Sequence, residues 1–328
     1  MSVNSPVRAP LVMALPSKGR LKEQVEAWLL DCGFRLEIAG GERGYRASLK
    51  GLPGAEIRLL SASDIAQSID VGDVHLGITG EDLLRERGGD VDGRVQLLRA
   101  LGFGRADLVV AAPQSWIDVD TMADVDDVAH AYLTRNGRRL RVATKYHTQT
   151  RAFFAAHGVA DYRIVDSLGA TEGAPAAGAA ELVVDITSSG ATLTANTLKI
   201  LNDGVILRSQ AQLAASLTAE WGEHQLDVLT RLMSVVEARA SGRSLCALRW
   251  PSDQDETAAT AVAGWLDRGA SLRSDGVLIR EADLFDVAAA LARLGVGPVS
   301  VTRPDYVFEA RSAPVDLLRQ RLGARSPG

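Results

Sequence analysis

The stretch ELVVDITSSGATLTANTLKIL, residues 181–201, decides the fold of this chain. Its apolar run at 182–186 predicts a buried strand, and the small, hydroxyl-rich residues 187–192 predict a loop. The leucines that follow, up to Leu201, are spaced as in a helix. A strand, a tight loop and a helix in this order form the unit from which parallel α/β sheets are built.

The loop in this unit is suited to hold one anion. It would offer backbone N–H groups, hydroxyl donors and the positive end of a helix dipole, which together suit a phosphate monoester. Gly190 would let the backbone come close to it, and Asp185 would accept hydrogen bonds from sugar hydroxyls. The candidate phosphate-binding residues are Thr187, Ser188, Ser189, Gly190, Ala191 and Thr192. The alternative is that the hydroxyl residues only cap a helix. No lysine follows the glycine, so the loop is not a Walker A motif.

Composition restricts the class of protein. The chain has 328 residues, of which 46% are hydrophobic and 23% charged, which predicts two or three packed domains. Asp and Glu exceed Lys and Arg by 41 to 36, which argues against broad nucleic-acid binding but leaves phosphorylated small molecules open. Cys32 and Cys246 form no metal or disulfide spacing. The first 20 residues contain neither a signal peptide nor a membrane span, so we expect a cytoplasmic protein.

The residues before the opening stretch continue the α/β pattern. Apolar runs at 11–15, 57–60 and 74–78 predict three strands, and 21–30 predicts an amphipathic helix. Ser63 and Asp64 could cap a second helix. Strands that alternate with helices predict a parallel sheet.

A second α/β unit follows, and the chain then returns to the first. The predicted strands of the second unit lie at 108–112, 141–144 and 162–165, and the returning strands at 205–209 and 212–216. We therefore expect two lobes with a cleft between them, the first made by residues 1–107 and 197–222 and the second by 108–196.

From residue 223 to 328 the pattern predicts a separate small α+β domain of the ferredoxin-like type. A helix leads into a strand at 245–250, a helix at 255–266, a strand at 277–279, a helix at 284–294 and a strand at 299–302.

Further polar residues follow predicted strands, where open α/β sheets bind ligands. Lys18 and Arg20 lie in the first strand-to-helix turn, and an arginine there can fork onto a phosphate. The other candidates are Asp64, Thr79, Asp82 and Lys145 for substrate phosphates, and Glu172 for a sugar. A surface turn explains Lys18 and Arg20 equally well, and helix capping explains Asp64. Together these residues predict one cleft.

The order of these motifs resembles ATP phosphoribosyltransferase, the first enzyme of histidine biosynthesis. The resembling segments are ALPSKGRL (14–21), SASDI (61–65), LGITGEDLL (76–84), LGFG (101–104), RVATKY (141–146), ATEGAP (170–175) and VVDITSSGATLTAN (183–196). They occur in family order across roughly residues 11–216, and the set is far more specific than any one member.

The resemblance implies a fold like the type II periplasmic binding proteins and a reaction. N1 of the ATP adenine attacks C1 of phosphoribosyl pyrophosphate (PRPP), pyrophosphate leaves, and Mg²⁺ is required. Residues 187–192 would hold the 5-phosphate of PRPP, Asp185 and Glu172 the ribose hydroxyls, and Lys18 and Arg20 substrate phosphates. No side chain is assigned as a general acid or base, because N1 already carries a lone pair, and no dedicated metal ligands are assigned.

The C-terminal domain resembles the regulatory domain of longer family members, which implies a histidine effector and a homo-oligomer, a hexamer or a dimer. A domain kept only for assembly is the alternative. Two other functions stay open: a non-enzymatic two-lobed sensor of a phosphorylated metabolite, and a regulatory subunit of a larger histidine-pathway complex. No membrane or nucleic-acid partner is expected.

Overall fold

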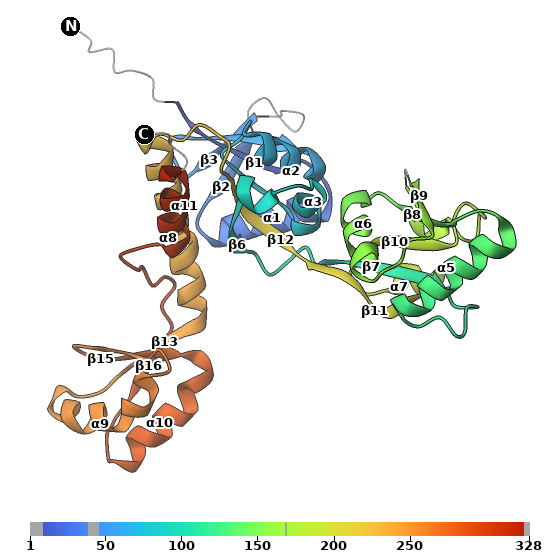
Figure 1. Ribbon diagram of the computed structural model, residues 1–328. Coiled ribbons are helices and arrows are strands. Elements are labelled where there is room, and N and C mark those ends of the chain that lie inside the picture. The colour runs from blue at the N-terminus through green and yellow to red at the C-terminus, as the bar shows by residue number, and fades with distance from the viewer. Residues whose placement is uncertain (1–8, 39–45, 168, 325–328) are drawn as a thin grey trace, which may run out of the picture.

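The computed structural model describes residues 9–38, 46–167 and 169–324. The described chain forms three sheets of seven, five and four strands. Figure 1 shows two lobes side by side and a third body at the far end of the long helix α8 (Glu223–Ser244). Two stretches of chain connect the lobes, one before β7 (Ala106–Pro113) and one between β11 (Leu198–Ser209) and β12 (Ala211–Ser216).

Lobe I is built on the seven-stranded sheet, in the order β2-β3-β4-β1-β5-β12-β6. Its strands besides β12 are β1 (Leu11–Pro16), β2 (Arg35–Ile38), β3 (Arg46–Lys50), β4 (Ala55–Leu60), β5 (Leu76–Gly80) and β6 (Val95–Ala100). β1 runs parallel to β4 and β5 and is buried along its whole length, which explains its unbroken apolar sequence. β2, β3 and β6 were not predicted. β2 and β3 alternate between more and less exposed residues at one edge of the sheet, so their apolar signal is weak.

Helices cover both faces of this sheet. They are α1 (Gly19–Asp31), α2 (Ala62–Val71), α3 (Glu81–Glu86) and α4 (Val91–Arg94), together with part of α8. The predicted cap of α2 was wrong, because Ser61, not Ser63, is its N-cap. The Asp64 N–H donates to the Ser61 hydroxyl at 3.2 Å, and that hydroxyl donates to the Asp64 carboxylate at 2.7 Å. Asp64 thus belongs to the first turn of α2 and supports its cap.

Lobe II is built on the five-stranded sheet, in the order β11-β7-β10-β8-β9. Its other elements are β8 (Leu140–Thr144), β9 (Tyr162–Asp166), β10 (Leu182–Thr187), α5 (Met122–Asn136), α6 (His147–Ala156), α7 (Ala191–Ala195) and the 3-10 turn η1 (Thr171–Gly173). The order β9-β8-β10-β7-β11 repeats the order β4-β1-β5-β12-β6 of lobe I, with β7 and β12 antiparallel to their neighbours. This is the two-lobed arrangement of the type II periplasmic binding proteins, as predicted.

The helix predicted after residue 192 is much shorter than expected. α7 ends at Ala195, and Thr197 has a φ of +57° that turns the chain. Leu198 and Leu201 therefore lie on β11, which pairs antiparallel with β7 from Leu198 opposite Pro113 to Ser209 opposite Ala106. This pairing puts residues 198–209 in the sheet of lobe II, whereas the sequence predicted a return to lobe I at residue 197. The spacing of the leucines suits a helix as well as a strand with bulges.

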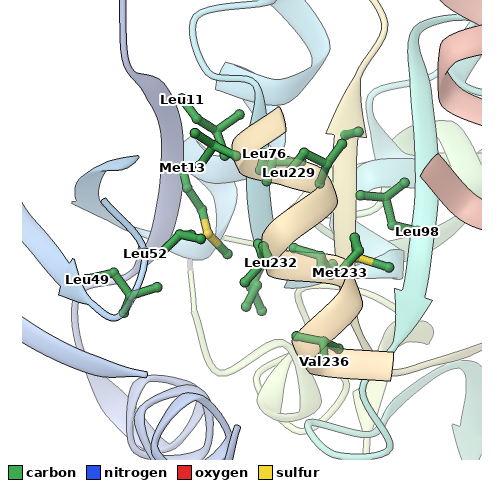
Figure 2. Close-up of a cluster of buried hydrophobic side chains, with 14 of the residues drawn as sticks. Leu11, Met13, Leu49, Leu52, Leu76, Leu98, Leu229, Leu232, Met233 and Val236 are labelled. Atoms are coloured by element: carbon green, nitrogen blue, oxygen red, sulfur yellow. The ribbon is translucent and has the colours of Figure 1, made fainter. Parts of the chain in front are cut away.

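The chain after residue 222 is divided between lobe I and the third body. Figure 2 shows Leu229, Leu232, Met233 and Val236 of α8 beside Leu11, Met13 and Leu76 of the lobe I strands. The terminal helix α11 (Ala313–Gly323), which was not predicted, returns to the same core with Val315 and Leu318. The Gln96 side-chain amide donates to the Pro314 carbonyl oxygen at 3.0 Å. Half of α8 and all of α11 thus complete lobe I, although the sequence predicted a separate domain from residue 223 to 328.

The third body has the predicted ferredoxin-like α+β fold. Its elements are β13 (Leu245–Arg249), η2 (Ser252–Gln254), α9 (Asp255–Leu266), β14 (Ser271–Arg273), β15 (Gly276–Arg280), η3 (Glu281–Asp283), α10 (Leu284–Arg293) and β16 (Ser300–Thr302). The antiparallel order is β14-β15-β13-β16. β14 was not predicted, because it is a short, exposed edge strand with two polar residues of three.

None of the helices in the described ranges is long and apolar enough to cross a membrane. Residues 1–8, part of the stretch that we predicted to contain no signal peptide, lie outside the described residues.

Candidate functional site

A cleft of about 540 Å³ lies between the two lobes. Its lining residues come from both lobes: Arg20, Leu21, Gln24, Ala62, Gly80, Asp82, Leu83, Gly102, Phe103, Gly104, Arg105, Ala106, Ile186 and Ser188. Three predicted site residues, Arg20, Asp82 and Ser188, are therefore brought to one cavity from separate parts of the sequence.

The hydroxyl-rich loop of lobe II joins β10 to α7 at the edge of this cleft. The Gly190 N–H donates to the Thr187 hydroxyl at 2.8 Å, and Gly190 has a φ of +75°, which a residue with a Cβ rarely adopts. This turn leaves Ser188 and Ser189 exposed. Ala191 and Thr192, in the first turn of α7, are also exposed. Ser188 lines the cleft, and the exposed hydroxyls of Ser188, Ser189 and Thr192 are donors of the kind that a phosphate needs.

Asp185 lies two residues before this loop, on β10. Its Oδ1 accepts the Ile186 N–H at 2.8 Å and lies 4.0 Å from Lys145 Nζ. Lys145 follows β8, the neighbouring parallel strand, so the sheet brings the two side chains together. Glu172 belongs to η1, which packs against β10. This part of lobe II collects two carboxylates and one ammonium group beside the loop.

Lobe I contributes cations from the start of α1. Arg20 is exposed and lines the cleft, and Lys18 is the exposed N-cap residue of the same helix. Asp64 is also exposed, with its carboxylate in the cap of α2. Lys18, Asp64, Lys145, Glu172 and Asp185 are not among the cleft-lining residues.

Thr79 and Asp82 have internal partners instead of free polar atoms. Thr79 is fully buried, and its hydroxyl donates to the Ala62 carbonyl oxygen at 2.8 Å. Asp82 accepts from the Tyr146 hydroxyl at 2.7 Å and from the Ser209 hydroxyl at 2.8 Å. The sequence pattern placed both residues at the correct strand end but could not distinguish a ligand from a supporting group.

Tyr146 joins lobe II to lobe I through this bond. Burial, and next the Asp82 carboxylate, raise the pKa of Tyr146 above its ordinary value, so the phenol stays protonated and donates. Glu86 of α3 makes a second connection, because its two oxygens accept the N–H groups of Thr148 and Gln149 at 2.8 and 3.2 Å. A carboxylate of lobe I thus caps the first turn of α6 in lobe II.

Sequence reasoning missed the cleft residues of the segment 102–106. Arg105 is exposed and Phe103 is half-buried, and both line the cleft where the chain crosses from lobe I to lobe II. The LGFG segment was noticed only for its resemblance. The signal that could have found Arg105 was an arginine directly after a glycine-rich crossing, since a crossing between lobes borders the cleft by necessity.

Among the residues that the structure describes, no three His, Cys, Asp or Glu side chains converge to hold a metal ion. Asp185 is one carboxylate beside the loop at 187–192, and carboxylate oxygens are the ligands that Mg²⁺ prefers.

Known proteins similar to this chain agree with the motifs. The family model of ATP phosphoribosyltransferase (HisG) matches residues 61–235. An ATP phosphoribosyltransferase from Caulobacter vibrioides is 69% identical over 316 residues, which are 96% of this chain and 99% of that protein. One from a Bradyrhizobium species is 49% identical over 92% of this chain and 94% of its own.

A solved structure, the ATP phosphoribosyl transferase (HisG:HisZ) complex from Thermotoga maritima, matches with a TM-score of 0.52 at 24% identity. The match covers 69% of this chain and 98% of that chain, and it bears on the fold alone.

Proposed function

Because this chain belongs to the ATP phosphoribosyltransferase family, we propose that the cleft between its lobes is the active site of that reaction. The protein is a phosphoribosyltransferase, and it catalyses the first step of L-histidine biosynthesis. ATP and PRPP react to give N1-(5-phosphoribosyl)-ATP and pyrophosphate. A non-enzymatic sensor and a regulatory subunit are set aside, because relatives that match nearly the whole chain are named as the enzyme.

Lobe II binds PRPP in this proposal. The 5-phosphate lies against residues 187–192, where backbone N–H groups and the hydroxyls of Ser188, Ser189 and Thr192 donate to it. Asp185 and Glu172 accept hydrogen bonds from the ribose hydroxyls. The observation that carries the proposal is that Ser188 of this loop and Arg20 of lobe I line one cleft.

Lobe I and the crossing segment bind the phosphates of ATP and the pyrophosphate group. Arg20 and Arg105 face the cleft, and Lys18 extends this positive wall from the N-cap of α1. Lys145 lies on the lobe II side, within ion-pair distance of Asp185. Thr79 and Asp82 position neighbouring residues and do not contact substrate themselves. Asp82 holds Tyr146, the residue after Lys145, by a hydrogen bond. Thr79 holds the start of α2, where Asp64 lies.

The residues accelerate the reaction by positioning and by charge. The adenine N1 attacks with its own lone pair, so no side chain needs to remove a proton. As the C1–pyrophosphate bond breaks, the ribose gains oxocarbenium character, and the nearby Asp185 carboxylate stabilises that positive charge. Arg20 and Arg105 stabilise the negative charge that develops on the leaving group. Holding both substrates in one cleft supplies the favourable orientation.

Mg²⁺ is the proposed metal ion, and bound to the pyrophosphate oxygens it would screen their charge. Asp185 would hold the ion together with oxygen atoms of the substrate, since no group of three or more His, Cys, Asp or Glu side chains converges among the described residues.

The third body is proposed to bind histidine as a feedback effector and to assemble the chain into a homo-oligomer, a hexamer or a dimer. If the third body serves only assembly, the chain forms the same oligomer but histidine does not inhibit the enzyme. We also propose a cytoplasmic location, where PRPP and ATP are made.

The test is a near-ultraviolet assay of the purified chain with ATP, PRPP, Mg²⁺ and pyrophosphatase, with and without histidine. Formation of phosphoribosyl-ATP that is lost in an Arg20→Ala, Arg105→Ala double variant supports the site. Unchanged kcat/KM in that variant, with its fold intact by circular dichroism, would contradict it. A rate insensitive to histidine would leave the third body an assembly module.

A further inference from the structure

A second cavity, of about 310 Å³, lies on lobe I between α1, the end of β6 and α8. Its lining is separate from that of the catalytic cleft except for Gly102, which lines both. Trp28, Leu101 and Val236 supply an apolar wall. None of the residues assigned above to PRPP or ATP lines this cavity.

Three arginines line the cavity against one carboxylate. Arg239 and Arg243 pair with the same oxygen of Asp31, at 3.0 and 2.5 Å. The hydrogen bond from Arg239 is the main cause that lowers the pKa of Asp31, so this carboxylate is charged. Asp305, outside the lining, pairs with Arg239 at 3.1 Å, and the arginines remain in excess even with it counted.

Arg99 is the third arginine, and its charge has no ionic partner among the described residues. It projects from β6 and is half-buried. Within residues 9–38, 46–167 and 169–324, its guanidinium makes no hydrogen bond and no ion pair. A guanidinium with no ionic partner is free to pair with an anion that enters the cavity.

The cavity also contains a buried thiol, Cys32. It lines the cavity and is 3% exposed. Burial raises the pKa of this thiol to about 11 and Asp31 adds to the rise, while Arg239, Arg243 and Arg99 each oppose it. The thiol therefore stays protonated and is no nucleophile. The cavity is built for binding an anion, not for covalent chemistry.

We propose that this cavity binds a phosphoryl anion, inorganic phosphate or the diphosphate released by the reaction, through Arg99, Arg239 and Arg243. Guanidinium groups fork onto phosphate oxygens, and the excess positive charge of the lining matches a phosphate better than a neutral ligand. Two sources share this chemistry, and the experiment below separates them by affinity.

Occupancy of the cavity would reach the catalytic cleft through the crossing segment. Leu101 and Gly102 line the new cavity, and Gly102 to Ala106 line the cleft. The Gly102 N–H donates to Gln210 Oε1 at 3.0 Å, and Gln210 lies in the other connection between the lobes. An anion held beside Leu101 would thus contact the segment that connects the lobes and borders the cleft, and we expect it to change KM for PRPP.

The experiment titrates the full-length chain with inorganic phosphate and follows the melting temperature. At about five times the dissociation constant, a single bound phosphate should raise it by roughly 1–2 °C for a chain of this length. Arg99→Gln should abolish the part of this rise that comes from the new cavity. Arg163→Gln is the matched control, because Arg163 is an exposed strand arginine of lobe II remote from both cavities.

A second variant separates this site from the catalytic loop, which also attracts phosphate. Gly190→Ala crowds the loop and should leave the Arg99-dependent rise intact. Loss of the rise in Gly190→Ala with its retention in Arg99→Gln would overturn the proposal, since phosphate would then bind only the catalytic loop. The proposal would also be overturned if phosphate raised the melting temperature of none of the proteins, or if Arg163→Gln lost as much of the rise as Arg99→Gln.

The same titration with pyrophosphate identifies the ligand. If pyrophosphate binds at least about tenfold more tightly than phosphate, and this binding depends on Arg99, the ligand is the product diphosphate. If pyrophosphate binds less tightly than that, the ligand is inorganic phosphate. Arg99→Gln should keep its turnover without added phosphate, since Arg99 lies outside the cleft. That turnover also separates this inference from the proposed active site, which fails only if the cleft variants stay active.

Discussion

The two walls of the cleft between the lobes treat their polar groups in different ways. In lobe I, Thr79 at the end of β5 and Asp82 just after it are buried and bonded to the protein, Thr79 to Ala62 and Asp82 to Tyr146 and Ser209. In lobe II, Ser188, Ser189 and Thr192 are exposed on a short loop. The buried groups of lobe I hold the protein together, whereas the exposed hydroxyls of lobe II remain available to a ligand. Polar residues that follow equivalent strands of the two lobes therefore have different roles.

The largest effect should come from adding a methyl group to the loop of lobe II. Gly190→Ala is expected to weaken PRPP binding by about 100-fold or more, because a Cβ would keep the phosphate from the backbone donors. Calorimetric titration with PRPP measures the loss. Gly137→Ala is the control: Gly137 ends α5 at a φ of +64°, and a Cβ there meets nothing within 4 Å. Equal PRPP affinities in the two variants would contradict the loop assignment.

Removing the charge of Asp185 should have the next largest effect. Asp185→Asn can keep the bond from the Ile186 N–H, so the fold should be preserved. The kcat/KM for PRPP should fall by about 10- to 100-fold, since hydrogen bonds to a charged group contribute roughly 1.5–3 kcal/mol. Steady-state assays at saturating ATP provide the measurement. A lower melting temperature with unchanged kcat/KM would make Asp185 a structural residue only.

The rigid wall can be tested by removing one hydroxyl. Tyr146→Phe leaves an oxygen of the buried Asp82 without its donor and should lower the free energy of unfolding by about 1–3 kcal/mol. Urea unfolding gives this value. Tyr162→Phe is the matched control, because among the described residues the Tyr162 hydroxyl makes no hydrogen bond. If the free energy of unfolding falls equally little in both variants, the hydrogen bond from Tyr146 to Asp82 does not stabilise the fold.

The smallest effect concerns pH and a histidine that holds lobe I together. His75 Nδ1 accepts the Val12 N–H at 3.1 Å, so Nε2 carries the proton and donates to the Glu220 carbonyl at 2.9 Å. Burial lowers the pKa of His75, so the folded protein resists protonation. As the pH falls below about 6.5, His75 becomes protonated in the unfolded chain but stays neutral in the folded chain. The free energy of unfolding should then fall by on the order of 1 kcal/mol, until the pH reaches the lowered pKa.

Urea unfolding at pH 7.5 and 5.5 tests this dependence. The pH dependence should shrink in His75→Gln and persist in His130→Gln, since His130 is an exposed histidine. A loss of stability at low pH that is the same in both variants would assign it to other groups.

Much of the fold was predictable, and the misses share a cause. Strands such as β1 and β10 are buried runs of apolar residues, and their signal is local. β2, β3 and β14 were missed because strands at or next to the edge of a sheet carry exposed polar residues. The helix predicted through Leu201 failed because two or three leucines fit a strand as well as a helix, and only pairing with β7 decides between them.

The candidate site divides in the same way. Local sequence predicted the loop at 187–192 and the cations of the first turn, since a hydroxyl-rich turn after a buried strand leaves few other structures open. It did not predict Arg105, whose position depends on where the chain crosses between lobes. It also could not separate Asp82 from a ligand, because the partners Tyr146 and Ser209 are 64 and 127 residues away.

The sequence by itself determined the α/β class, the strand and hydroxyl-rich loop at 182–192 and, through its collinear motifs, the family. These depend on neighbouring residues, whose backbone preferences act within a few positions. Only the tertiary structure decided that α11 returns to lobe I, that Thr79 and Asp82 are held inside, and that Arg99, Arg239 and Arg243 share a cavity. Each of those facts joins residues far apart in the chain, and burial and charge act across space regardless of that separation.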